Sequence, residues 1–157
     1  MRTHRAVGLL LIAAALIAGG YAVLGGRQPL EAHILDVTGY TENVKIWMPF
    51  RVTLGLTNRG RDLLTLRRIH VEPDFENFSE TFNEETYQLD PPLLIEPGSS
   101  ISYQAAFTLL NASQLQDGSH AMVFRVVIEQ DNGRETRLEF PAIFDQTPDP
   151  ANRKLQF

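Results

Sequence analysis

The chain has 157 residues, no cysteine and a formal net charge of −5 at pH 7. The lack of cysteine excludes disulfide-stabilised folds and a lipid anchor attached through a thiol. All 19 acidic residues but only 12 of the 14 basic residues follow residue 26, so the remainder of the chain has a net charge of −7. A surface this acidic argues against binding to nucleic acid.

Residues 6–26 form an uncharged, apolar segment, AVGLLLIAAALIAGGYAVLGG. As a helix it measures about 31 Å, enough to cross the hydrocarbon core of a bilayer. A cleaved secretory signal peptide is the alternative, but its apolar region is usually only about 7–15 residues long. We therefore expect an uncleaved transmembrane anchor.

The charges that flank this segment predict its orientation. Arg2 and Arg5 precede it, whereas after Arg27 the next basic residue is Lys45. The positive-inside rule then keeps residues 1–5 in the cytoplasm. In a bacterium the anchor lies in the inner membrane and the rest of the chain is periplasmic.

Small residues repeat along one side of the predicted transmembrane helix. Such a stripe allows a second helix to pack closely within a membrane, although alanine-rich anchors can also simply face lipid. The candidate helix-packing residues are Ala14, Ala15, Ala18, Gly19, Ala22 and Gly26.

Strand patterns dominate the remainder. Apolar side chains occupy every even position from Val44 to Leu56, while the odd positions are mostly polar or small. This alternation predicts a half-buried strand. A second strand, Leu64–Val71, changes phase at Arg67-Arg68, which indicates a bulge. Further strands are expected near residues 32–38, 101–109, 122–128 and 138–140, with turns at 58–60, 97–98 and 131–133.

About seven strands with frequent turns predict an all-β, antiparallel β-sandwich. The expected organisation is a linker at residues 27–31, one exported domain at 32–145 and an extended tail at 146–157. The tail is either disordered or a docking arm that ends in Leu155-Gln156-Phe157.

Three segments resemble bacterial immunoglobulin-like and fibronectin type III-like modules, including those of the cell-adhesion-related type. They are FRVTLGLTNRG (50–60), IEPGSSISYQAAF (95–107) and HAMVFRVVIEQDNG (120–133). The resemblance covers about residues 32–145. It implies an immunoglobulin-like sandwich with a binding or spacing role, although the long acidic stretch before Pro97 departs from compact members of this class.

The topology that this resemblance implies brings the N-terminus to the same end as the loops 58–62, 97–99 and 131–134. With so short a linker, this end would lie close to the bilayer. The candidate contacts to lipid headgroups or to a partner's carboxylates are then Arg27, Arg59, Arg61 and Arg134. Glu42 and Asp117 would point away.

Trp47, the only tryptophan, lies in the outward phase of its strand. It is either an anchor for a partner or a cover for a sheet edge that Pro49 also protects.

The stretch 72–90 holds seven acids and no base. Three interpretations are open. The stretch is a solvated crossover whose aromatic residues hold it to the core, a binding surface for a partner, or a calcium site. Phe75, Phe78 and Phe82 also allow a short amphipathic helix.

No catalytic motif is present. His4, His33, His70 and His120 are scattered, and a metal site at His70 and His120 is weakly supported. We therefore expect no enzyme activity and no cofactor, metal or small-molecule substrate. The predicted function is a single-span accessory subunit of a bacterial membrane complex of the respiratory or photosynthetic type. The alternative is a free-standing, membrane-anchored module that binds an adhesion, cell-wall or chaperone partner.

Overall fold

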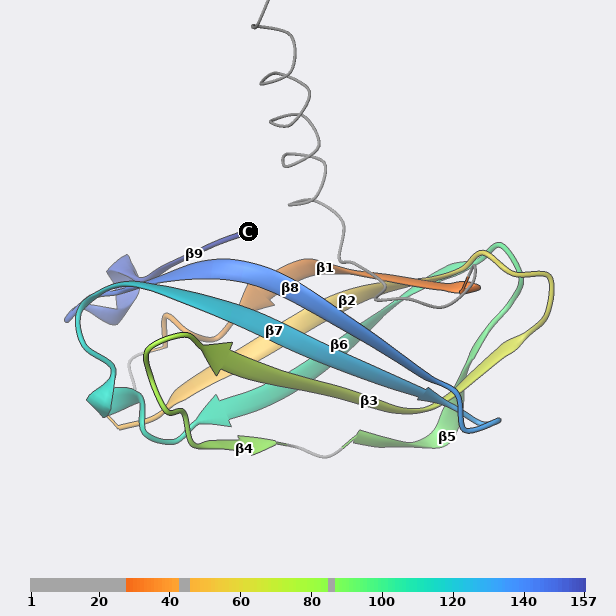
Figure 1. The fold of residues 1–157 in the computed structure, drawn as a ribbon, viewed down its shortest axis with the longest axis horizontal. Helices are drawn as coiled ribbons and strands as arrows, with labels where there is room; N and C mark the ends of the chain where they lie inside the picture. Colours follow the sequence, from red (N-terminus) through yellow and green to blue (C-terminus); the bar gives the residue numbers. More distant parts are fainter. Residues whose placement is uncertain (1–27, 43–45, 85–86) are drawn as a thin grey trace, which may run out of the picture.

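The computed structural model describes residues 28–42, 46–84 and 87–157. The predicted transmembrane helix at residues 6–26 lies outside this part of the chain. Within these ranges, no helix has the length and apolar character needed to span a bilayer. The described residues fold into two antiparallel sheets (Figure 1), so the predicted all-β sandwich is confirmed.

Four strands form the first sheet, in the order β1-β2-β6-β4, and five form the second, in the order β5-β3-β7-β8-β9. The first sheet contains β1 (Leu30–Thr38), β2 (Met48–Asn58), β6 (Ser100–Leu109) and β4 (Phe82–Glu84). The second contains β5 (Tyr87–Ile95), β3 (Leu64–Phe75), β7 (Gly118–Gln130), β8 (Glu135–Gln146) and β9 (Lys154–Gln156). Two single-turn 3₁₀ helices, η1 (Ala112–Gln114) and η2 (Pro150–Asn152), follow β6 and β8.

The core between the sheets is built from the apolar phase of each long strand. Phe50 of β2 stacks on Phe107 of β6, with ring centroids 4.9 Å apart, and both rings contact Phe124 of β7 across the sandwich. The alternating apolar residues of these strands are predicted to face the core, and all eight are buried: Phe50, Val52, Leu54, Leu56, Phe107, Phe124, Val126 and Phe140. Period-two alternation therefore assigned the inward face correctly.

The predicted bulge is present in β3. Its register against both β5 and β7 shifts between Leu66 and Arg68. The shift lets Leu66 and Ile69 both face the core, although they lie an odd number of positions apart, with two residues between them. The extra residue explains why the apolar pattern changes phase at this point.

The acidic stretch differs from one expectation and agrees with another. β3 continues to Phe75, a turn follows, and β4 begins at Phe82, so the proposed amphipathic helix is wrong. Phe75 and Phe78 meet edge to face, with ring centroids 5.7 Å apart. Phe75 is buried in the core, so these rings hold the stretch to the sandwich, as the crossover interpretation expected.

The tail is also more ordered than a free arm. β9 pairs with residues 143–145 of β8, and the Phe157 ring lies 5.9 Å from that of Phe124. Together β4, β5 and β9 bring the described part of the chain to nine strands, compared with the about seven expected.

Candidate functional site

The start of the described chain is fixed to one end of the sandwich. The backbone N–H of Arg59 donates to the carbonyl of Pro29 at 2.6 Å, and the Thr136 hydroxyl donates to Oε1 of Gln28 at 2.6 Å. Gly60 allows this close approach, because a Cβ there would lie 2.7 Å from the Cβ of Pro29. The chain therefore enters the domain at the end that carries the β2–β3, β5–β6 and β7–β8 turns (Figure 1).

Asn58 joins two of these turns. Its side chain is fully buried, and its Nδ2 donates to the carbonyls of Asp62 at 2.7 Å and Ile95 at 2.9 Å. Its Oδ1 accepts from the N–H of Gly60 at 2.9 Å. Its own backbone bonds to Gly98 and Ser99, so the β2–β3 and β5–β6 turns form one rigid surface.

Three of the predicted contact arginines lie at this N-terminal end. Nε of Arg59 forms an ion pair with Oε2 of Glu31 at 2.7 Å, and both side chains are more than half exposed. Arg61 and Arg134 are exposed and line a hollow of about 220 Å³ between the β2–β3 and β7–β8 turns. The end is of mixed charge, because Asp62 and Asp131 line the same hollow.

Gln130 also lines this hollow, and it was not among the predicted site residues. It is only 4% exposed, and its Nε2 is a buried donor without a hydrogen-bond partner in the described part of the chain. The alternation of the strand predicts its burial, because Gln130 continues the inward phase of Phe124, Val126 and Ile128. An unmet donor beside two arginines is suited to an anionic group, such as a phosphate or a carboxylate.

The other predicted contacts lie elsewhere. Trp47 is 44% exposed and precedes β2, at the opposite end of the sandwich from the arginines. β2 pairs with β1 only as far as Arg51, so Pro49 lies where this side of β2 has no partner strand among the described residues, and its protection of a sheet edge stays a prediction. Arg27 and the six helix-packing residues lie outside the described residues.

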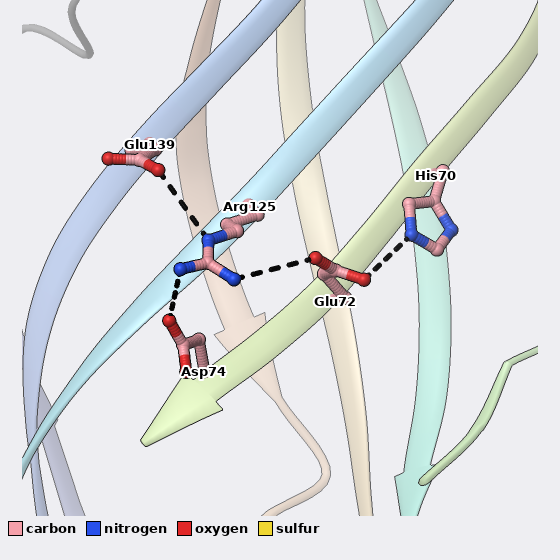
Figure 2. A network of polar contacts seen from close by, with 5 residues as sticks. All are labelled: His70, Glu72, Asp74, Arg125 and Glu139. Carbon is pink, nitrogen blue, oxygen red and sulfur yellow. Dashed lines mark hydrogen bonds and ion pairs between the residues drawn. The ribbon is translucent and has the colours of Figure 1, made fainter. Parts of the chain in front are cut away.

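A polar network covers the outer face of the second sheet (Figure 2). The Arg125 guanidinium on β7 contacts Asp74 and, at 3.9 Å, Glu72 of β3, and it reaches Glu139 of β8 at 3.5 Å. Nε2 of His70 lies 3.1 Å from Glu72. One cation on β7 thus bridges three carboxylates on the two strands beside it, β3 and β8, which favours the β3–β7–β8 register.

An apolar groove of about 610 Å³ lies beside this network. Ala121, Val123, Pro141 and Ile143 of β7 and β8 line it, with Asp74 at one border and Phe157 at another. Ile143 and Phe157 are each about half exposed. The groove offers a mostly apolar surface, with the carboxylates of Asp74 and Glu76 among its lining residues.

His70 and His120 do not converge, and His4 lies outside the described residues. His70 pairs with Val127 in the register, far along β7 from His120, whose Nε2 bonds to the carbonyl of Gln116. In residues 28–42, 46–84 and 87–157, no three His, Asp or Glu side chains are arranged to hold a metal ion.

Comparisons with known proteins assign this chain to no family. The sequence matches no protein-family model, and no curated protein matches it significantly. A FixG-related protein from Vibrio parahaemolyticus is similar in structure, with a TM-score of 0.44, 11% identity, and coverage of 73% of this chain and 94% of that one.

Two further solved structures are similar to a comparable degree. A structural-genomics target has a TM-score of 0.42 and 13% identity, over 76% of this chain and 84% of that one. A conjugative transposon lipoprotein from Bacteroides eggerthii has a TM-score of 0.35 and 15% identity, over 72% of this chain and 95% of that one. The two antiparallel sheets of the described residues themselves define the class of fold, a β-sandwich.

Proposed function

We propose that this chain is a non-enzymatic, single-span accessory subunit of a bacterial membrane complex of the respiratory or photosynthetic type. Residues 6–26 anchor it in the inner membrane, with residues 1–5 in the cytoplasm and an immunoglobulin-like sandwich in the periplasm. The sandwich then stabilises assembly by contacts above the bilayer.

One observation supports this proposal above the others: the sandwich holds the chain by hydrogen bonds already at residues 28 and 29. Gln28 and Pro29 are already bonded to Thr136 and Arg59. If residues 6–26 span the membrane, one residue lies between the span and Gln28, so the end with Arg59, Arg61 and Arg134 is close to the bilayer. A module built to reach a distant ligand would gain from a longer linker.

The stripe of small residues in the anchor supplies the second contact. A partner helix could approach along Ala14, Ala18 and Ala22, so the complex would be held both in the bilayer and above it. Arg61, Arg134 and the Nε2 of Gln130 would bind lipid phosphates or the carboxylates of a partner subunit.

Co-purification in mild detergent tests this function. The native chain should elute with stoichiometric membrane partners, and the double variant Ala18→Leu, Ala22→Leu should lose them while the sandwich stays folded. Leu10→Ile serves as a matched control on the same helix. Elution of the native chain as a lone monomer, or retention of all partners by the double variant, would contradict the proposal.

The alternative, a free-standing binding module, is favoured by the apolar groove on β7 and β8. It predicts the lone monomer in the same experiment, together with capture of a soluble partner that an Ile143→Asp substitution abolishes.

A further inference from the structure

A second hollow lies at the opposite end of the sandwich from the chain start. Its volume is about 370 Å³, and it is enclosed by the connection from η1 to β7 on one side and by the end of β8 and the segment around η2 on the other. Gln116, Asp117, Gln146 and Arg153 are among its lining residues. This size is suited to a small polar group rather than to a protein surface.

Arg153 supplies a cation that has no counter-ion among the residues that the structure describes. One terminal nitrogen of its guanidinium, Nη1, donates to the carbonyl of Tyr40 at 2.8 Å, which fixes the side chain. Its Nε is buried and has no hydrogen-bond partner, and no carboxylate in the described part of the chain forms an ion pair with it. Burial lowers the pKa of Arg153 from its usual value, but an arginine keeps its charge in proteins.

Gln146 adds a second unmet group to the same hollow. The residue is only 8% exposed, and its Oε1 is buried without a hydrogen-bond partner. An unpaired buried donor or acceptor is costly, so two in one small hollow indicate a missing partner. Arg153 requires an acceptor, whereas Gln146 Oε1 requires a donor.

A carboxylate with a neighbouring N–H meets both requirements. The carboxylate accepts from the guanidinium of Arg153, and the N–H donates to Oε1 of Gln146. Asp117, which is exposed at the rim, offers a further acceptor for a positively charged nitrogen. A simple anion such as phosphate would satisfy Arg153 but would leave the Gln146 acceptor unpaired.

We propose that this hollow binds an α-carboxylate with its adjacent N–H, supplied either by a free amino acid or by the C-terminus of a peptide. The site lies at the end of the domain away from Pro29, so it is open to solutes even where the N-terminal end faces a bilayer. This inference does not depend on the proposed subunit role.

The test is an NMR titration of the full chain in detergent, following the Nε–Hε resonance of Arg153, which is assigned by its loss in Arg153→Lys. The probes are glycine, N-acetylglycine, N-acetylsarcosine, which keeps the carboxylate but lacks the N–H, and glycinamide, which lacks the carboxylate. Glycine or N-acetylglycine should shift the resonance saturably, and N-acetylsarcosine should bind about tenfold more weakly because Gln146 stays unpaired. Glycinamide should not bind.

The two sources are separated by which probe binds more tightly. Preference for glycine indicates a free amino acid, and preference for N-acetylglycine indicates a peptide C-terminus. Gln146→Met should weaken either probe about tenfold, while Arg137→Gln, an exposed arginine paired with Glu135, should change nothing. No saturable shift at concentrations on the order of 50 mM, or equal binding of N-acetylsarcosine and N-acetylglycine, would overturn the proposal.

Discussion

The side-chain amide of Asn58 donates a hydrogen bond of 2.9 Å to the carbonyl of Ile95, 37 residues further along the chain. Asn58 ends β2 and Ile95 ends β5, so this one bond connects the two sheets at the N-terminal end of the sandwich. Both residues are fully buried, and no water needs to mediate the contact.

Replacing Asn58 with alanine should lower the free energy of unfolding by about 2–4 kcal/mol, because the Ile95 carbonyl and the Gly60 N–H lose their partner in a buried site. Urea denaturation of the full chain in detergent measures the change. Asn83→Ala, an exposed substitution on β4, should stay within about 0.5 kcal/mol of the native chain. Equal costs for the two variants would show that Asn58 does not hold the turns.

Phe124→Ala should lower the free energy of unfolding by about 3–5 kcal/mol. Phe124 is fully buried and contacts Phe50 and Phe107 of the opposite sheet, so its loss opens a cavity at the centre of the core. Ile143→Ala, on the outer face of β8 and 48% exposed, is the control and should cost far less. A near-zero cost for Phe124 would mean that the inward phase of β7 is misassigned.

Gly60→Ala should loosen the attachment of the chain start. The added Cβ would meet the Cβ of Pro29 at 2.7 Å, and such overpacking costs typically about 1–3 kcal/mol. Because Pro29 must shift, the N–H of Arg59 should lose its bond to the Pro29 carbonyl and exchange with deuterium faster. Unchanged exchange at Arg59 would indicate that Pro29 is not packed against Gly60 in solution.

Arg125→Met should destabilise the sandwich only modestly, by less than about 1 kcal/mol, because the arginine is 46% exposed and its ion pairs are screened by solvent. The cost should nevertheless exceed that of Arg137→Met, since Glu72, Asp74 and Glu139 would then repel one another. High salt should reduce the difference between the two variants. A difference that is independent of salt would indicate that packing, not charge, explains it.

The long strands were predictable because one face of each is buried and the other is solvated. β2 shows this alternation from Met48 to Leu54 and β7 from Met122 to Gln130, and their inward residues were identified correctly. β4 and β9 have three residues each, too few for a period to be recognised. The spacing of Phe75, Phe78 and Phe82 fits a helix equally well, and only the tertiary contacts of these rings decide between the two structures.

The candidate sites were predictable to a smaller extent. The strand topology alone brings Arg59, Arg61 and Arg134 to one end of the sandwich. The positions of the acidic side chains beside them depend on the conformation of the turns. Gln130 and Gln146 were missed because polar residues are usually assigned to the surface. Each continues the inward phase of its strand by one step, after Ile128 and Phe144, and that continuation is the signal that identifies them.

The orientation of the sandwich is tested most directly by the depth of two spin labels in lipid nanodiscs. The chain has no native cysteine, so the variants Arg61→Cys and Asp117→Cys can each be labelled at a single position. Both side chains are exposed, and they lie at opposite ends of the domain. A label at residue 61 that lies closer to the bilayer than one at residue 117 is the predicted result, and the reverse order would contradict a membrane-facing N-terminal end.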